Sequence, residues 1–455
     1  MTTTGPTLAM LVDDLASGRT TSRALVEQCL DRIDDRDGEG SRTFLQVSRE
    51  TARMAADGID ALRAAGAAPS PFAGIPISIK DLFDVRGDVT MAGSRALSDA
   101  APAAADAPSV RRLRRAGFVI IGRTNMTEFA YSGLGLNPHY GTPRNPWDRA
   151  TGRIPGGSSS GAAVSLTDGM AHAALGTDTG GSCRIPAAFT GLVGFKPTAR
   201  RVPLDGAVPL SPSLDSIGPI ARTVACCAAL DAILADEQSM DVSPVSVEGL
   251  RLLVPTTIMF DNIDDVVAKA FERALSRLSA AGARITEAPF PAFDEIPKIN
   301  AKGGFTAAES YAWHQPLISQ KKHLYDPRVA VRILRGAEQS AADYIAVLAA
   351  RKSLVDQATA ALAPYDALIM PTVPMIPPRL SDLADDETYG RVNLLALRNP
   401  TTINMIDGCA ISLPMHEPGE APTGFMLAGA GGSDRRILGI AAGLEPVLAG
   451  PMAQD

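Results

Sequence analysis

A serine that follows two glycines is the first feature of the sequence that could do chemistry. It ends the run GTDTGGS from Gly176 to Ser182, where the glycines allow the backbone to turn so that successive N–H groups converge on one point. Convergent N–H groups stabilise the negative charge that develops on a carbonyl oxygen under attack, so Ser182 is a candidate nucleophile for acyl transfer. A phosphate-binding loop is the alternative, but no lysine follows in the P-loop register.

A second serine-rich loop, GGSSSG from Gly156 to Gly161, offers another candidate nucleophile. Its last five residues fit the G-x-S-x-G elbow with Ser159 at the centre, but that elbow needs a preceding strand, and residues 150–155 (ATGRIP) are not typical of one. The elbow also needs a histidine base. The histidines that follow the loop have no distinctive sequence context; they are His172, His314, His323 and His416. We therefore expect a serine hydrolase whose base is not histidine.

A lysine at the end of a short apolar segment supplies a candidate base. Lys80 lies near the end of GIPISIKD, residues 74–81, which is typical of a short strand. A lysine at a strand end usually faces solvent and has no role in chemistry. If Lys80 is buried, however, desolvation lowers the pKa of its amine, and the neutral form can accept a proton near neutral pH.

The composition is that of a globular protein and argues against several other classes. The 455 residues are 45% hydrophobic and 20% charged, with a net charge of −7. Because basic and acidic residues are interspersed, we expect no nucleic-acid ligand, and we interpret the basic cluster at 111–115 (RRLRR) as a solvated helix face. No apolar run is long enough to span a bilayer and the N-terminus has no secretory signal, so we expect a soluble, cytoplasmic protein.

The cysteines indicate neither a disulfide framework nor a metal site. The chain has five of them, with no CxxC pair and no histidine placed as a partner ligand. Cys29 lies in an apolar helical pattern, where a free thiol is usually a small core residue.

Helical and β-type segments alternate along the chain. Residues 25–33 and 266–278 carry apolar side chains at helical spacing, and the second segment leads into a β-type stretch at 283–286. This alternation indicates an α/β protein with a largely parallel or mixed sheet. Residues 122–194 are rich in Gly, Ser, Thr, Asn and Pro, and we expect them to form loops packed on an active-site face. Other short apolar runs expected to be strands are 75–79, 118–121, 252–254 and 367–370.

The order and spacing of these motifs closely resemble the amidase signature family. In that family a strand-end lysine, a serine in a GGSS[SG]G loop and a second serine in GTDxGGS form a Ser-cisSer-Lys triad. Ser158 and Ser182 are 24 positions apart (182 minus 158), which is the family separation, and Lys80 precedes them. The resemblance is dense over residues 74–222. Further landmarks are GRTNMTEF at 122–129, GTPRNPW at 141–147, GFKPT at 194–198, SLDSIGP at 213–219, MPT at 370–372 and AISLP at 410–414.

The resemblance implies a fold, a mechanism and a role for each motif residue. The implied fold is α/β: one compact domain over residues 1–455, with a central mixed sheet of about eleven strands surrounded by helices. Ser182 would form the acyl-enzyme, Ser158 would pass protons after a cis peptide bond, and Lys80 would be the ultimate base. No metal and no cofactor are implied. The other assignments are the backbone N–H groups of Thr179, Gly180, Gly181 and Ser182 as the oxyanion hole, and Ser159, Asp178 and Arg184 as supporting residues.

The resemblance therefore predicts an amidohydrolase that cleaves the C–N bond of a small-molecule carboxamide and releases ammonia or an amine. A first alternative is the glutaminase-type component of a tRNA-dependent amidotransferase. That class usually continues after GFKPT with tyrosine-glycine and an RFG run, whereas this chain has ARRVPL at 199–204. A second alternative is a catalytically silent protein with this fold, which the filled triad positions disfavour. The oligomeric state stays open, with a homodimer as one arrangement.

The substrate pocket is expected to be formed by segments without family landmarks. Residues 290–365 should form a variable wall, and residues 130–133 another. Cys183, where the family more often has an aliphatic residue, is interpreted as a packing substitution and not as a catalytic thiol. The aromatic residues of the long segment favour an aryl or apolar acyl group, although core packing is an equal expectation; they are Phe305, Tyr311, Trp313 and Tyr325.

Overall fold

A mixed sheet runs through the whole molecule. The computed structural model describes residues 5–239 and 242–450, so residues 1–4, 240–241 and 451–455 of the expected domain lie outside the described residues. The strands are β1 (Phe44–Val47), β2 (Pro76–Lys80), β3 (Val119–Thr124), β4 (Ala173–Asp178), β5 (Val193–Lys196), β6 (Ser216–Ala221), β7 (Arg251–Pro255), β8 (Arg284–Ala288), β9 (Ala367–Pro371), β10 (Cys409–Pro414) and β11 (Gly424–Gly429). They form one 11-stranded sheet in the order β1-β3-β2-β4-β6-β5-β10-β11-β9-β7-β8. The expected α/β fold around a mixed sheet is confirmed.

The sheet has two parallel groups of strands separated by an antiparallel middle, and the edge strand β1 pairs antiparallel with β3. Strand β2 pairs in parallel with β3 and β4, and β7 pairs in parallel with β8 and β9. Between these parallel groups, the pairs from β4 to β9 through β6, β5, β10 and β11 are antiparallel. Strands β2, β4 and β11 are buried along their whole length, whereas the edge strand β8 is largely exposed. A sheet covered on both faces requires such continuous apolar or small-residue runs in its inner strands.

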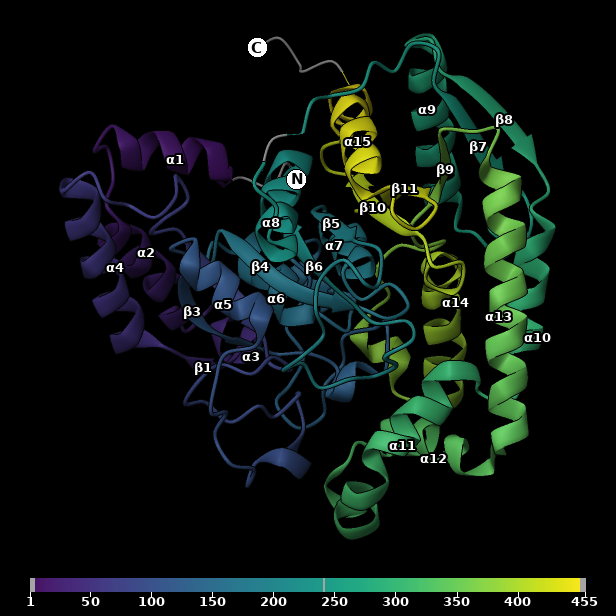
Figure 1. The fold of residues 1–455 in the computed structure, drawn as a ribbon, viewed down its shortest axis with the longest axis horizontal. Helices are drawn as coiled ribbons and strands as arrows, with labels where there is room; N and C mark the ends of the chain where they lie inside the picture. The colour runs from purple at the N-terminus through teal and green to yellow at the C-terminus, as the bar shows by residue number, and fades with distance from the viewer. Residues whose placement is uncertain (1–4, 240–241, 451–455) are drawn as a thin grey trace.

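Helices pack along the sheet from one end to the other. Figure 1 shows α2 and α4 near β1 and β3, and α9 near β7, β8 and β9 at the opposite end. In the same view α11 and α12 lie below the sheet, beside α13. The helices are α1 (Leu8–Ala16), α2 (Ser22–Asp34), α3 (Gly40–Thr43), α4 (Arg49–Ala64), α5 (Pro108–Arg115), α6 (Ser160–Thr167), α7 (Arg184–Thr190), α8 (Val224–Ala235), α9 (Asp265–Ala280), α10 (Glu295–Ile299), α11 (Gly304–Lys321), α12 (Pro327–Leu334), α13 (Ala341–Leu362), α14 (Asp386–Met405) and α15 (Asp434–Ala449).

Elements with a strong hydrophobic period were predictable from the sequence. The expected helices at 25–33 and 266–278 are α2 and α9, and the β-type stretch at 283–286 belongs to β8. Helix α9 begins after Asp264 and ends at Ala280, and Gly282 follows with a φ of 93°. A glycine suits this position because a left-handed backbone is costly for a residue with a Cβ atom.

The expectation that residues 122–194 are packed loops is wrong in part. This segment also contains α6, β4 and α7, all fully buried apart from the last residue of α6. Helix α6, SGAAVSLT, has no polar face because protein surrounds it, so its sequence carries no helical period. A Cβ atom on Gly161 would lie 2.5 Å from the carbonyl oxygen of Thr43, so small residues here reflect close packing and not loop structure.

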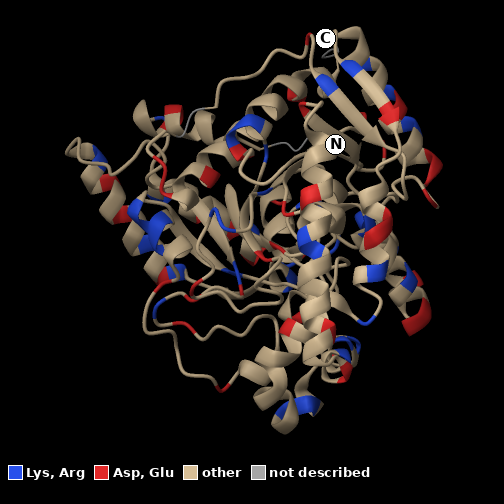
Figure 2. Cartoon of the chain, turned by 45° about the vertical axis from the view of Figure 1, so that its right-hand side comes forward, with Lys and Arg blue, Asp and Glu red and all other residues tan. Residues whose placement is uncertain are grey.

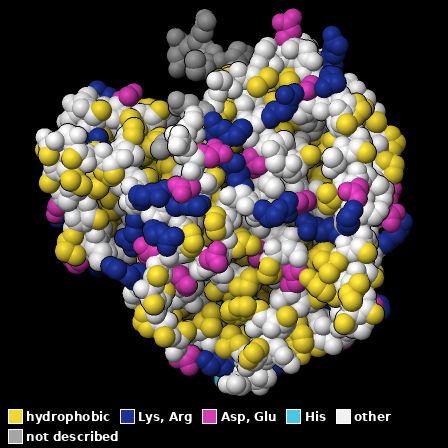
Figure 3. Space-filling model, in the orientation of Figure 1, with side chains coloured by type: hydrophobic (Ala, Val, Ile, Leu, Met, Phe, Trp, Pro, Cys, Tyr) yellow, Lys and Arg dark blue, Asp and Glu magenta, His cyan; other side chains and the backbone are white. Residues whose placement is uncertain are grey.

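Charged residues are interspersed over the surface. Figure 2 shows acidic and basic residues alternating along many helices. In the arginine cluster of α5, Arg114 pairs with Asp106 at 3.1 Å and Arg115 pairs with Asp236, as expected for an ordinary solvated helix face. Figure 3 shows hydrophobic side chains scattered over this face, with the most continuous patch in the lower centre of the view. In the described part of the chain, no helix combines the length and apolar character needed to cross a bilayer.

The central strands should carry much of the stability of the fold. Ile411 lies on β10 between β5 and β11, and its side chain is fully buried. We predict that Ile411→Ala lowers the free energy of unfolding by about 2–5 kcal/mol, because it leaves a cavity in a packed core. Urea denaturation would measure this. The matched control is Ile345→Ala on α13, a side chain that is 65% exposed. Equal losses in the two variants would contradict the prediction.

Candidate active site

The amine of Lys80 lies beside two hydroxyl groups at the end of a buried strand. Lys80 is the last residue of β2, and its Nζ lies 2.7 Å from Ser158 Oγ and 2.8 Å from Thr177 Oγ1. Because β2 and β4 are adjacent and parallel, the carboxyl ends of both strands meet at this point. Lys80 is fully buried, and this burial lowers the pKa of its amine to about 8. The neutral amine is therefore a minor form at pH 7, but its fraction is far larger than for a lysine in water.

The loop that carries Ser158 approaches its neighbours closely. The Gly157–Ser158 peptide bond is cis, as the family resemblance implied. The Gly157 N–H donates to the carbonyl of Gly133 at 2.8 Å, and the Ser158 carbonyl accepts from the Thr127 N–H at 3.1 Å. A Cβ atom on Gly157 would lie 2.5 Å from the backbone nitrogen of Gly135, so only glycine fits there. These contacts fix the position of the Ser158 side chain against Lys80.

Ser159 contacts the same pair of elements but not the lysine. Its Oγ donates to the carbonyl of Thr177 at 3.4 Å. This long hydrogen bond joins the start of α6 to β4, next to the threonine that contacts Lys80. The contact suits the supporting role that the resemblance implied, and that role stays a prediction.

The Ser182 loop is organised by the buried carboxylate of Asp178. One oxygen accepts the Gly181 N–H at 2.8 Å, and the other accepts the Cys183 N–H at 3.2 Å. Arg184 donates to both oxygens, at 2.8 and 3.0 Å. The chain thus turns around a single carboxylate, and Ser182 lies at the turn between the two N–H groups that it binds.

Asp178 is charged although it has no exposure to solvent. Burial alone would raise the pKa of this carboxyl group, but the Arg184 guanidinium outweighs that effect, and the pKa lies well below its usual value. Arg184 is also fully buried and donates to the carbonyl of Pro400 at 3.0 Å and to Asn404 Oδ1 at 2.6 Å. The pair therefore ties the nucleophile loop to α14, more than 200 residues away.

The predicted oxyanion hole needs one correction. The Gly181 N–H already donates to Asp178, so in this structure it is not free to receive a substrate oxygen. In contrast, the N–H groups of Thr179, Gly180 and Ser182 make no hydrogen bond with the described part of the chain. Gly181 orders the loop, and the other three groups are left as candidate donors.

Ser182 opens onto a cavity of about 380 Å³. Thr179 and Gly180 share its lining, and within the described residues the Ser182 hydroxyl makes no hydrogen bond. Both expected walls contribute, since residues 130–132 and parts of 296–335 line it. The opposite side comes from α14. The cavity therefore joins the motif loop to segments distant in sequence.

The four aromatic residues of the long segment do not line this cavity. Phe305 and Tyr325 are buried in hydrophobic clusters, and the Tyr325 hydroxyl lies 2.9 Å from His314 Nδ1. The structure thus bears out core packing for these two residues. It removes the basis for expecting an aryl acyl group, because the side chains that suggested one point elsewhere.

Three residues near the site had no role assigned from the sequence. Thr177 contacts Lys80, and the alternation of side chains along a strand was the only available signal for it. Asp215 accepts from Thr179 Oγ1 at 2.5 Å and from the N–H groups of Leu210 and Ser211. Burial raises the pKa of Asp215 to about 6, although these hydrogen bonds oppose the shift. Asn404 lies in a helix without any motif and could not have been found from its sequence context.

Cys183 is next to the nucleophile but is not a reactive thiol. It is fully buried, and burial raises the pKa of the thiol well above its usual value. Its Sγ lies 3.5 Å from the carbonyl oxygen of Gly218. A thiol in this environment is protonated and packs as a small apolar side chain. The cysteines at all five positions are free and buried.

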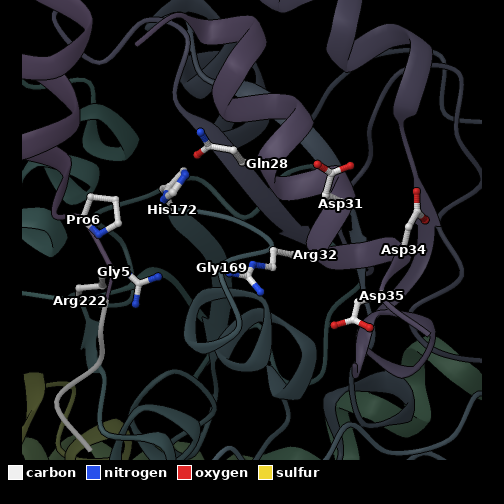
Figure 4. Close-up of a pocket in the computed structure, with 10 residues that line it drawn as sticks. All are labelled: Gly5, Pro6, Gln28, Asp31, Arg32, Asp34, Asp35, Gly169, His172 and Arg222. Atoms are coloured by element: carbon white, nitrogen blue, oxygen red, sulfur yellow. The ribbon is translucent and has the colours of Figure 1, made fainter. Parts of the chain in front are cut away.

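A larger cavity lies elsewhere, at the other end of β4. Its volume is about 740 Å³, and none of the triad candidates lines it. Figure 4 shows Arg222 and His172 on one side of it and Asp34 and Asp35 on the other. His172 directly precedes β4, whereas Asp178 ends that strand. The length of β4 therefore separates this cavity from the Ser182 loop.

Comparisons with known proteins agree on one family. The Amidase family model matches residues 24–438. The chain is 41% identical over 405 residues to 2-amino-5-chloromuconic acid deaminase from Comamonas testosteroni, covering 87% of this chain and 86% of that protein. It is 33% identical over 453 residues to the A component of glutamyl-tRNA(Gln) amidotransferase from Moorella thermoacetica, covering 92% of each. A crystal structure of an amidase matches with a TM-score of 0.88 and 33% identity over 97% of this chain and 99% of the other.

The Asp178–Arg184 pair should be needed for stability as well as for loop geometry. We predict that Asp178→Asn lowers the free energy of unfolding by about 3–5 kcal/mol, because Arg184 would be left as an unpaired buried charge. Chemical denaturation would measure the loss, and residual kcat should fall with it. The control is Asp356→Asn, which removes the same charge from an exposed pair with Lys352 and should change little. Wild-type stability of the Asp178 variant would refute the argument.

Proposed function

The chain belongs to the Amidase family and is an amidohydrolase, and we propose that Lys80, Ser158 and Ser182 are its catalytic triad. The observation that carries this proposal is the buried Lys80 amine, 2.7 Å from Ser158 Oγ. Ser182 supports it as the serine that lines the cavity beside unpaired N–H groups. A lysine with this environment can serve as a base where no histidine is available.

The reaction begins with attack on the amide carbonyl. Neutral Lys80 accepts the proton of Ser158 as Ser158 takes that of Ser182, and Ser182 Oγ bonds to the carbonyl carbon. The negative charge on the former carbonyl oxygen is stabilised by the N–H groups of Thr179, Gly180 and Ser182. The relay then returns a proton through Ser158 to the departing nitrogen, the C–N bond breaks and the acyl-enzyme forms. Water, deprotonated by the same relay, hydrolyses the acyl-enzyme and releases the carboxylate.

The fold raises the neutral fraction of Lys80 by desolvation. Burial is the main cause of its lowered pKa, and the nearby Asp178 and Asp215 carboxylates oppose this effect without reversing it. Thr177 accepts a hydrogen bond from Nζ and leaves the amine directed at Ser158. In the proposed mechanism, protonated Lys80 is a transient state that the same hydroxyl and carboxylates stabilise.

The substrate in this proposal is a small-molecule carboxamide, and the nitrogen product is ammonia. The Comamonas relative is named as a deaminase, which supports ammonia release. We also propose that the protein is cytoplasmic and forms a homodimer. The free state of the five cysteines suits a reducing compartment, and light scattering of the purified protein would report the dimer.

A glutaminase component of an amidotransferase is the second candidate, favoured by the similarity to the Moorella protein. Such a component supplies ammonia to a partner, so it should copurify with other proteins and favour glutamine. The ARRVPL run at 199–204 supports a free-standing hydrolase instead. Affinity purification from the native host distinguishes the two, because a stoichiometric partner would reverse our preference.

We predict that Ser182→Ala, Ser158→Ala and Lys80→Ala each lower kcat by at least about 10³-fold, because each removes either the nucleophile or a group that transfers its proton. Ammonia release from a panel of primary amides would measure this. Ser182→Ala alone should also abolish labelling by a fluorophosphonate probe. The control is Ser353→Ala on α13, far from the motif loops in sequence, which should retain full activity. Full turnover by folded Ser182→Ala would end the proposal.

The pH dependence should report the pKa of Lys80. Its pKa is lowered to about 8, and only the neutral amine is a base. We therefore predict that kcat/KM rises roughly tenfold per pH unit below that pKa and levels off above it. A pH–rate profile in buffers of constant ionic strength, with stability checked at each pH, would measure this. A rise of kcat/KM with a pKa near that of an ordinary lysine, or no change of kcat/KM with pH, would contradict a buried lysine base.

A further inference from the structure

The charged side chains that line the cavity next to Ser182 are all positive. They are Arg332, Arg335 and Arg398, and in the described part of the chain no aspartate or glutamate lines the cavity. Salt bridges are common elsewhere in this protein, but none is formed by these three arginines among the described residues. Arg332 and Arg398 are half-buried and Arg335 is exposed, so the lining carries a net positive charge that attracts an anion entering the cavity.

The three arginines differ in how many of their guanidinium nitrogens already donate hydrogen bonds. Arg398 donates from all three nitrogens, to Asn399 Oδ1 at 2.9 Å, to the Met259 carbonyl at 2.6 Å and to the Asp261 carbonyl. It is a structural residue that holds the loop before α9. Arg332 uses only Nη1, which donates to the Tyr131 carbonyl at 2.9 Å. Arg335 is exposed, and its side chain makes no hydrogen bond with the described residues, so its donors remain available to a ligand in the cavity.

Arg332 and Arg335 lie close to each other and to the catalytic loops. Arg332 is in α12, and Arg335 directly follows that helix. Both charges act on the hydroxyl of Tyr131: burial raises the pKa of Tyr131, and the two guanidinium groups oppose that shift. Arg332 also makes a cation–π contact, because its guanidinium carbon lies 5.1 Å from the centre of the Tyr389 ring.

A short stretch of backbone connects these arginines to the triad. Arg332 donates to the Tyr131 carbonyl, and two residues further on the Gly133 carbonyl accepts the N–H of Gly157, which precedes Ser158. The remaining wall is largely apolar, with Leu394 and Leu397 on α14. A ligand could thus present its amide to Ser182, its apolar chain to α14 and an anionic group to Arg332 and Arg335.

From this arrangement we propose that Arg332 and Arg335 bind a carboxylate of the substrate, so that the enzyme acts on amides that also carry a carboxylic acid group. Guanidinium groups bind carboxylates through paired, charge-assisted hydrogen bonds, which gives both affinity and orientation. The proposal deepens the proposed function by naming the class of amide, and it rests on the assignment of Ser182 as nucleophile. The monoamides of short dicarboxylic acids are the simplest members of this class.

The test of selectivity compares acidic and neutral amides. The monoamides of succinate, glutarate and adipate are assayed beside neutral alkanamides of matching length, by ammonia release. In the wild type, we expect kcat/KM for the best acidic amide to exceed that for the neutral amide of the same length by about tenfold or more. We expect Arg335→Ala or Arg332→Lys to lower this ratio by about tenfold or more. Equal use of acidic and neutral amides, or an unchanged preference in both variants, would overturn the proposal.

The matched control removes a positive charge outside the cavity. Arg391 lies on α14, is exposed and does not line the cavity, so Arg391→Ala should leave the preference unchanged. Arg335→Ala removes no hydrogen bond to a described residue, so it is the primary variant. Arg332→Lys retains the charge but loses the planar fork, and it also alters the contacts of Arg332 with Tyr131 and Tyr389. Circular dichroism would verify the fold of each.

A binding measurement separates this proposal from the triad assignment. Titration calorimetry of succinate, glutarate and adipate into Ser182→Ala needs no turnover, and we expect at least one dicarboxylate to bind, about tenfold or more weakly after adding Arg335→Ala. Fluorophosphonate labelling of the wild type reports Ser182 independently. Binding without labelling would refute the triad and retain the carboxylate site. Labelling with no dicarboxylate binding would refute the carboxylate site and retain the triad.

Discussion

The buried carboxylate of Asp178 is the interaction on which the arrangement of the site depends. It receives two backbone N–H groups from the Ser182 loop and two donors from Arg184, all within 3.2 Å. A charge without solvent is stable only when such donors surround it, so the loop conformation and the ionised carboxylate require each other. Because Arg184 also binds α14, the same contact sets the nucleophile against the wall of the cavity.

The sheet contributes the second constraint, which is the exclusion of water from Lys80. Parallel pairing of β2 with β3 and β4 carries the strand-end lysine into the interior, beside Thr177. Removal from water disfavours the charged amine, and this turns an ordinary lysine into a base for Ser158. The chemistry therefore depends on a position in the sheet and needs no unusual side chain.

The motif-rich residues 74–222 and more distant segments of the chain contribute different parts of the site. Residues 74–222 contain the proposed triad and its hydrogen-bond partners on β4 and the Ser182 loop, whereas much of the cavity wall comes from residues 296–335 and α14. The two parts meet through the Arg184–Asn404 contact and through the bond from Arg332 to Tyr131. The proposed catalytic residues and the cavity wall are thus held by different stretches of chain, and residues 130–133 contact both.

The sequence by itself determined the family, the α/β class and the residues of the proposed triad, because motif spacing and the strong periods of α2, α9 and the apolar strands are local properties. Only the tertiary structure decided the lowered pKa of Lys80, the use of the Gly181 N–H by Asp178, and the partners Thr177, Asp215 and Asn404. It also decided between the two expectations for the aromatic residues of the long segment, which do not line the cavity, and it placed three arginines in the lining. The physical reason is that burial, pKa and hydrogen-bond partners depend on residues far apart in sequence, and no local pattern records them.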